Sequence, residues 1–303
     1  MFLKKYPKIQ SLLKFIKWIW VVVVIIAVVF FLTTRWESIF ASFSDIPVSK
    51  LLWSASFLIF SKILLVYVTQ NSIQKEGITL PYPDVFSIVS FTHLAKYIPG
   101  GIWHYVGRLG AYGERDFGIK KSTRALIHEN VYLLSGALIV GIVAGSLSSQ
   151  GKVLLKNFGI NFSVVALAAV IVLLWGGMLI AYDKIIKPPS KISYIKLIPT
   201  LLLAWLSFGL SFGVIFPELS SNNMLLFISV YSIGWLVGYV AIFAPGGIGV
   251  RETVLVWMLG GIMDPEYAII FSAVHRFIFI LVEVALGGVS FVLSIRKRTN
   301  EKV

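Results

Sequence analysis

Residues 243–252 read FAPGGIGVRE, where Pro-Gly-Gly breaks an apolar run of membrane character just before two adjacent charges, Arg251 and Glu252. Residues 97–104 read YIPGGIWH and repeat the same break earlier in the chain. Proline has no N–H to donate and glycine weakens a helix, so each break should end or sharply bend one. In hydrocarbon the freed backbone groups are costly unless protein or a water-filled cavity receives them. The two breaks are therefore either buried structural hinges or the lining of a binding site.

The composition is that of a polytopic membrane protein. Of the 303 residues, 57% are hydrophobic and only 14% are charged, and several windows approach the roughly 20 apolar residues that span a bilayer. The formal net charge is +13, but the basic residues lie between the apolar windows, which favours topology signalling and anionic lipid over nucleic acid. Cysteine is absent, which excludes disulfides, thiolate metal sites and a cysteine nucleophile.

We predict an all-α chain that forms a single integral-membrane domain over 1–303. The windows expected as full spans are 15–32, 51–67, 125–145, 162–181, 197–216 and 268–293. The first expected span, 15–32, follows a basic region and has no small-residue cleavage site after it, which indicates a retained helix rather than a signal peptide. Two further apolar segments, 85–112 and 225–263, are interrupted by Pro-Gly-Gly. Each either crosses the membrane once as a kinked helix or turns back as a re-entrant hairpin.

Loop charges distinguish these two topologies, because Lys and Arg concentrate on the cytoplasmic side. If both broken segments return, seventeen Lys and Arg residues lie inside and only Arg35, Lys50, Lys152 and Lys156 lie outside. If each crosses once, the counts are roughly eleven against ten and the asymmetry disappears. We therefore predict two re-entrant hairpins, the first entering from inside and the second from outside, and both termini in the cytoplasm. The hairpin tips are Pro99, Gly100 and Gly101 in the first and Pro245, Gly246 and Gly247 in the second.

The order of span, span, hairpin and span occurs twice, over about 10–148 and about 158–296. Three full crossings separate equivalent points, so the two halves have opposite orientation. This is the inverted-repeat plan of many transporters, in which broken helices meet near the midplane and form the substrate site. Gene duplication in a protein that transports nothing is the alternative. The arms of the second hairpin are also long enough to span fully, which would leave the parity unchanged.

Residues 96–103, KYIPGGIW, and 244–252, APGGIGVRE, resemble the lysylphosphatidylglycerol synthase transmembrane family, also called the flippase-like domain family. The resemblance covers nearly the whole length, because spacing and hydropathy follow that domain too. It implies a bacterial or archaeal inner-membrane protein, related to the part of the synthase that moves lipid between leaflets. The chain departs from the full synthase because it has no soluble aminoacyl-transfer domain. The synthase reaction is therefore not implied and the lipid stays open, since stand-alone members serve varied surface-lipid and glycan pathways.

Basic side chains in or near apolar segments are the first candidates for substrate binding. Lys62 lies in the middle of the second span, where an unpaired charge costs roughly 2.5–3.5 kcal/mol; it is either a headgroup anchor or part of an internal ion pair, unless it snorkels. His93, Lys96, His104 and Arg108 lie on both sides of the first break, and four potential cations at a helix break suit an anionic phosphate. For Arg108 the alternative is a place at the cytoplasmic interface.

The second half of the chain supplies further candidates. Arg251 either reaches the substrate or pairs with Glu252 or Glu283, and Glu252 also suits the positive end of its helix dipole in a structural role. Arg276 and Glu283 are seven residues apart on one face of the last span. Glu283 needs protonation or a cationic partner there, so we expect an ion pair that is remade between two conformations. In the first half Glu129 is the corresponding candidate.

Other chemistry finds little support in the sequence. The four histidines show no metal-motif spacing, and a Walker-type phosphate loop is absent, so we expect no metal or cofactor and no ATP-driven transport by this chain alone. The leading hypothesis is a lipid translocase whose partner is a membrane lipid, either an anionic phospholipid or a lipid-linked glycan. The alternatives are a membrane-embedded lipid-modifying transferase and a non-transporting subunit that assists glycosyltransferases of a glycan pathway. The oligomeric state is left open.

Overall fold

The computed structural model describes residues 46–97, 102–157, 163–216, 221–241, 244–260 and 262–300, and within these ranges it contains helices and no strands. The predicted all-α class is confirmed. The expected span 15–32 and the tip residues Pro99, Gly100 and Gly101 lie outside the described residues. In chain order the elements are α3 (Val48–Lys75), α4 (Tyr82–His93), η2 (Leu94–Tyr97), α5 (Trp103–Gly113), α6 (Ile119–Leu147), α7 (Ser149–Asn157), α8 (Val164–Ile186), α9 (Tyr194–Gly213), α10 (Ser221–Val240), η3 (Pro245–Gly247), α11 (Val250–Leu259) and α12 (Pro265–Asn300).

Six of these helices, α3, α6, α8, α9, α10 and α12, are long and apolar enough to cross a membrane. The prediction of a multi-pass membrane protein is confirmed at this level. Five of them coincide with predicted spans, whereas α10 lies in the segment that we assigned to one arm of the second hairpin. Its apolar part has 18 residues, which is about 27 Å of helix, so this arm is long enough for a full crossing. The second arm, α11, has 10 residues and is too short.

Proline and a left-handed residue set several of the helix ends. Pro47 precedes α3 and Pro81 precedes α4, where the missing N–H and fixed φ suit a helix start. At the other end of α8, Lys187 adopts a left-handed φ of 49° and two prolines follow it, so the helix cannot continue. These local signals divide the apolar sequence into separate helices.

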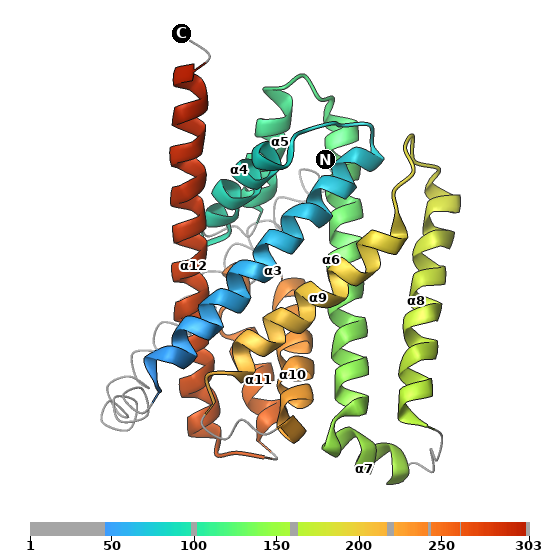
Figure 1. Ribbon diagram of the computed structural model, residues 1–303, viewed down its shortest axis with the longest axis vertical. Helices are drawn as coiled ribbons and strands as arrows, with labels where there is room; N and C mark the ends of the chain where they lie inside the picture. Colours follow the sequence, from blue (N-terminus) through green and yellow to red (C-terminus); the bar gives the residue numbers. More distant parts are fainter. Residues whose placement is uncertain are drawn as a thin grey trace, which may run out of the picture.

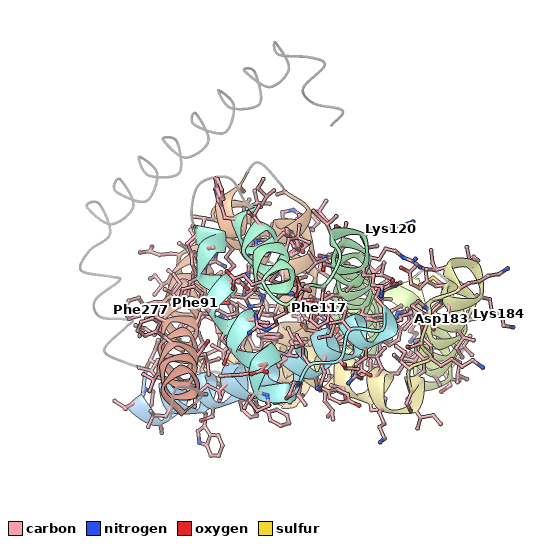
Figure 2. The ribbon with its side chains drawn as sticks, turned by 90° about the horizontal axis from the view of Figure 1, so that it is seen from above. Phe91, Phe117, Lys120, Asp183, Lys184 and Phe277 are labelled. Atoms are coloured by element: carbon pink, nitrogen blue, oxygen red, sulfur yellow. The ribbon has the colours of Figure 1, made fainter. Side chains whose placement is uncertain are left out.

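The helices form one bundle in which α3 packs along α9, while α10 packs between α6 and α9 (Figure 1). Small residues allow the closest approaches. A Cβ added to Gly209 of α9 would lie 2.5 Å from the Cα of Ile228, and one added to Gly141 of α6 would lie 2.5 Å from Ile233. Such small-residue contacts are typical of helix association in lipid. On the outside, Phe91 and Phe277 project from the edge of the bundle (Figure 2) and are more than half exposed, as lipid-facing side chains should be.

The helix ends divide between two ends of the bundle (Figure 1). The end of α3, the start of α6, the end of α8, the start of α9 and the end of α12 all lie at the upper end in that view. The start of α3, the short helix α7 and the start of α12 lie at the lower end. Between them α4 packs on α5 and α12, and α11 packs on α10 and α12. These two helix pairs bring the segments of the two Pro-Gly-Gly breaks into the interior.

A buried polar cluster fastens α8 to the bundle at one end. Lys75, at the end of α3, is fully buried and forms an ion pair with Asp183 of α8. His128 of α6 contacts the carboxylate of Glu76 at 2.8 Å and the hydroxyl of Tyr182 at 2.9 Å. Buried charges are tolerated when they are paired and hydrogen-bonded in this way. The cluster therefore links α3, α6 and α8 through polar contacts.

Candidate functional site

The two broken segments meet inside the bundle, because η2 and η3 are in direct contact. Arg276 of α12 donates a 2.6 Å hydrogen bond to the carbonyl of Gly246, and a Cβ at Gly246 would lie 3.8 Å from the ring of Tyr97. Gly246, Gly247 and Gly249 have φ values of 59°, 72° and 84°, which only glycine adopts without strain. The second Pro-Gly-Gly is thus a compact turn that brings backbone close to side chains of the other half.

A cavity of about 320 Å³ lies beside this meeting point. Eight of the ten residues that the sequence singled out for substrate binding line it: Lys62, His93, Lys96, His104, Arg108, Glu129, Arg251 and Arg276. They come from both halves of the chain and from α3, α4, η2, α5, α6, α11 and α12. Gly246 and Gly247 also line the cavity. The fold therefore gathers candidate residues that lie up to 214 positions apart in the sequence (276 − 62).

Glu283 anchors the cationic side of the cavity. Its carboxylate is 3% exposed and accepts hydrogen bonds of 2.5 Å from Lys62, Lys96 and the Tyr97 hydroxyl. The expected cationic partner is present, and for Lys62 the alternative of an internal ion pair is correct. The partner is not Arg276, however. Arg276 lies two turns from Glu283, about 10 Å along α12, whereas α3 and η2 bring both lysines directly to the carboxylate.

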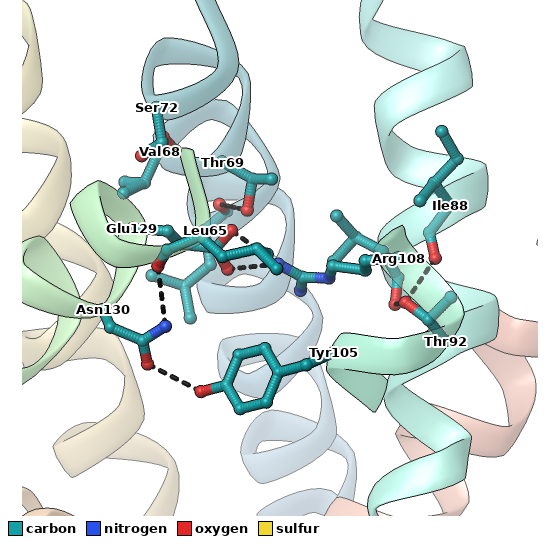
Figure 3. A network of polar contacts seen from close by, with 12 residues as sticks. Leu65, Val68, Thr69, Ser72, Ile88, Thr92, Tyr105, Arg108, Glu129 and Asn130 are labelled. Atoms are coloured by element: carbon teal, nitrogen blue, oxygen red, sulfur yellow. Dashed lines mark hydrogen bonds and ion pairs between the residues drawn. The ribbon is translucent and has the colours of Figure 1, made fainter. Parts of the chain in front are cut away.

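Arg108 and Glu129 form a second buried ion pair in the cavity wall (Figure 3). Arg108 lies 2.5 Å from both carboxylate oxygens of Glu129, and its other terminal nitrogen lies 2.8 Å from His93 Nε2. The guanidinium is 1% exposed. Arg108 is therefore buried in the bundle rather than exposed on its surface, because α5 packs on α4 and α6 and turns this side chain inward.

The second break separates the roles of its two adjacent charges. Glu252 does not line the cavity; its carboxylate accepts a 2.8 Å hydrogen bond from the backbone N–H of Gly249 and caps the start of α11, the structural role that the dipole argument allowed. Arg251 is 3% exposed, and its guanidinium carbon lies 4.3 Å from the centre of the Tyr231 ring. Among the described residues it pairs with neither Glu252 nor Glu283, the two partners considered from the sequence.

Uncharged polar and aromatic residues in the cavity wall escaped the sequence analysis. Asn130 Oδ1 accepts a 2.7 Å hydrogen bond from the hydroxyl of Tyr105 (Figure 3), and a second hydrogen bond from the hydroxyl of Tyr239. Trp235 stacks on Tyr239 with ring centres 4.8 Å apart, and all four residues line the cavity. The spacing of Trp235 and Tyr239, four apart on α10, places them on one helical face. This spacing could have identified the two aromatic residues as candidates for the cavity wall from the sequence alone.

The cavity carries an excess of positive charge. Five cationic side chains surround it, namely Lys62, Lys96, Arg108, Arg251 and Arg276, against the carboxylates of Glu129 and Glu283. Glu283 forms ion pairs with both lysines, and Glu129 forms one with Arg108. In the part of the chain that the structure describes, Arg251 and Arg276 have no carboxylate partner. The site can therefore receive at least one anionic group from outside the protein.

Comparison with known proteins adds no relative. No family model matches the sequence, and no curated protein matches it. Over the described residues, no three His, Asp or Glu side chains group in a way that could hold a metal ion. The function must therefore be inferred from the cavity and its setting.

Proposed function

We propose that the protein is a lipid translocase of the flippase-like kind, which moves an anionic or glycosylated lipid between the leaflets of a bacterial or archaeal inner membrane. The observation that carries the proposal is a cavity with five cations against two carboxylates, inside a bundle of membrane-length helices. Unpaired charge is expensive in hydrocarbon. An anionic headgroup that enters the cavity offsets this cost, while its acyl chains stay in the bilayer.

The arrangement of helix ends supports the re-entrant topology on which this proposal depends. The end of α3 and the start of α6 lie at the same end of the bundle, and the end of α9 and the start of α12 lie at the other (Figure 1). Each broken segment can thus enter and return on one side, one from each face, as an inverted repeat requires. The basic loops that follow α5 and α8 belong to the upper end, which the positive-inside rule would make cytoplasmic.

The contacts also suggest how access would alternate. A lipid phosphate held at Arg251 and Arg276 brings negative charge near Lys62 and Lys96, because all four cations lie around the Phe279 ring. The phosphate then competes with Glu283 for the two lysines. The bonds that it replaces hold η2 against α3 and α12. Loosening them would free the first broken segment to move against the second at the η2–η3 contact. Rocking of one half against the other is the usual form of alternating access in such repeats.

Translocation in vesicles tests the proposal. Purified protein is reconstituted with a trace of fluorescent phosphatidylglycerol, and dithionite reports the lipid that reaches the outer leaflet. We expect lipid to exchange between the leaflets well above the rate of protein-free vesicles. The double variant Arg251→Gln/Arg276→Gln should lose this exchange; it removes two cations without leaving a carboxylate unpaired. Lys120→Gln, which removes an exposed charge at the start of α6, serves as the matched control. Exchange at the protein-free rate for the folded wild-type protein would refute a translocase for this lipid.

A lipid-modifying transferase is the second candidate, because two histidines face the same cavity. The rings of His93 and His104 lie 6.4 Å apart, and Nδ1 of His104 has no hydrogen-bond partner among the described residues. A neutral imidazole in this position could accept a proton from a lipid hydroxyl. Mass spectrometry of lipids incubated with the purified protein separates the two functions. A product of altered mass supports the transferase, and unchanged mass together with exchange supports the translocase.

A further inference from the structure

Two guanidinium groups in the lining of the cavity lie close to one aromatic ring. The guanidinium carbons of Arg251 and Arg276 lie 5.6 Å and 6.0 Å from the centre of the same ring, that of Phe279. One terminal nitrogen of Arg276 donates to the Gly246 carbonyl, while its buried Nε has no hydrogen-bond partner among the described residues. Guanidinium forks match the oxygens of a phosphate, and their charge cannot be lost by deprotonation. This part of the lining is therefore suited to a phosphate.

Other parts of the lining have different chemistry. Trp235 contributes an aromatic face, and Asn130, Tyr105 and Tyr239 contribute amide and hydroxyl groups without charge. The nearby carboxylate, Glu129, is already occupied by Arg108 on both oxygens. An ammonium group in the ligand would find no available carboxylate here and would meet an excess of cations. Both tyrosine hydroxyls donate to Asn130 Oδ1, and the Asn130 amide donates one N–H to the Leu126 carbonyl. Ligand hydroxyl groups can therefore donate to the tyrosine oxygens and accept from the second amide N–H of Asn130.

We infer that the cavity is a two-part site, with a phosphate subsite at Arg251 and Arg276 and a subsite for an uncharged polyhydroxyl group at Asn130, Tyr239 and Trp235. The substrate class is then a lipid phosphate that carries a glycerol or sugar headgroup, and not an aminoacylated or choline-bearing lipid. This inference rests on the proposed function for its lipid part. The volume of about 320 Å³ lies at the lower end of the range for small-molecule sites, which suits a headgroup without its acyl chains.

Binding of short-chain lipids to the purified full chain in neutral detergent tests the inference without requiring transport. Calorimetry compares dihexanoyl phosphatidylglycerol, dihexanoyl phosphatidylcholine and dihexanoyl phosphatidic acid. We expect phosphatidylglycerol to bind at least about tenfold more tightly than phosphatidylcholine. Both lipids offer the same phosphodiester to the two arginines, but only choline brings a further cation into a cavity with an excess of cations, and only glycerol offers hydroxyl groups to the second subsite. Equal affinity for these two lipids would overturn the inference on the wild-type protein alone, without any variant that must fold.

Variants then assign the two subsites. Arg251→Lys and Arg276→Lys keep the charge but remove the planar fork, and each should weaken phosphatidylglycerol binding about tenfold. Asn130→Ala should weaken the binding of phosphatidylglycerol and leave the binding of phosphatidic acid unchanged, because phosphatidic acid has no glycerol headgroup. Lys120→Gln is again the matched control. If the folded Arg→Lys variants bind phosphatidylglycerol as tightly as the wild type does, the phosphate subsite is refuted. If Asn130→Ala weakens the binding of phosphatidylglycerol and phosphatidic acid equally, the polyhydroxyl subsite is refuted.

Failure of the inference can be told apart from failure of the proposed function. Free glycerol phosphate that binds as tightly as dihexanoyl phosphatidylglycerol would uphold the phosphate subsite and refute a lipid as its natural ligand. Exchange of lipid in vesicles together with equal binding of phosphatidylglycerol and phosphatidylcholine would uphold the translocase and refute the subsite.

Discussion

At the scale of single residues, the ring of Phe279 organises the charges of the cavity. Lys62 Nζ and Lys96 Nζ lie 4.5 Å and 4.7 Å from its centre, and the two guanidinium carbons lie within about 6 Å. An aromatic ring attracts a cation to its face, more strongly when water is excluded. Phe279 therefore partly offsets the repulsion among four cations, of which the two lysines pair with Glu283 and the two arginines have no carboxylate partner among the described residues.

Replacing this ring should lower the stability of the bundle more than replacing its outward neighbour. Phe279→Leu removes the cation–π contacts and is expected to reduce the free energy of unfolding by about 2 kcal/mol. Phe277→Leu is the matched control, since Phe277 lies on the same helix but faces outward (Figure 2) and is more than half exposed. Unfolding in detergent by denaturant titration measures both. Equal losses in the two variants would contradict the role given to the ring.

Charged site residues could be found from the sequence, whereas their partners could not. A Lys or Glu within an apolar run is conspicuous because it is expensive there, and Lys62 and Glu283 were recognised for that reason. Their ion pair joins residues 221 positions apart, and no local pattern encodes such a contact. Tyr97, Tyr105 and Tyr239 escaped notice because tyrosine is also common in interfacial belts.

At the scale of elements, hydropathy predicted the long helices, and it left open whether α10 is a hairpin arm or a full span. Five predicted spans lie in α3, α6, α8, α9 and α12, because about 20 apolar residues are a strong signal. α10 was read as a hairpin arm because the Pro-Gly-Gly break follows it directly. The cluster around Lys75 was missed as well, since Lys75 is the last residue of α3 and looks like an ordinary flanking charge.

The Lys75–Asp183 ion pair of that cluster predicts that α8 loses stability when Asp183 is replaced. Asp183→Asn leaves the fully buried amine of Lys75 without its carboxylate partner, and breaking a buried pair on one side costs about 3 kcal/mol or more. We expect faster hydrogen exchange along α8 and a lower unfolding temperature. Lys184→Gln, at the next position and exposed (Figure 2), is the control. Unchanged exchange in Asp183→Asn would show that apolar packing alone holds α8.

At the scale of the whole molecule, the predicted topology rests on the distribution of charge rather than on hydropathy. Counting Lys and Arg selected the topology in which each broken segment returns to its own side. The positions of the helix ends in Figure 1 agree with that topology. The inverted-repeat plan led us to expect that the broken segments meet, but not which residues do so, because the contact of η2 with η3 depends on the packing of α4 and α11 against α12.

The cysteine-free chain allows a direct test of sidedness. Thr79→Cys before α4 and Lys120→Cys after α5 should react with a membrane-impermeant maleimide only from the cytoplasmic side, since α4 and α5 return. Lys152→Cys in α7 should react only from outside; all three positions are exposed. Labelling of residues 79 and 120 from opposite sides would mean that the first broken segment crosses once, and the inverted repeat would fail.

Native mass spectrometry of the purified protein tests most directly whether the cavity holds an anionic lipid. We predict that one phosphate-bearing lipid without an amine co-purifies with the wild-type protein and is lost in folded Arg251→Gln/Arg276→Gln, but retained in Lys120→Gln. A zwitterionic or aminoacylated lipid bound in its place, or equal retention of lipid in all three proteins, would contradict the account.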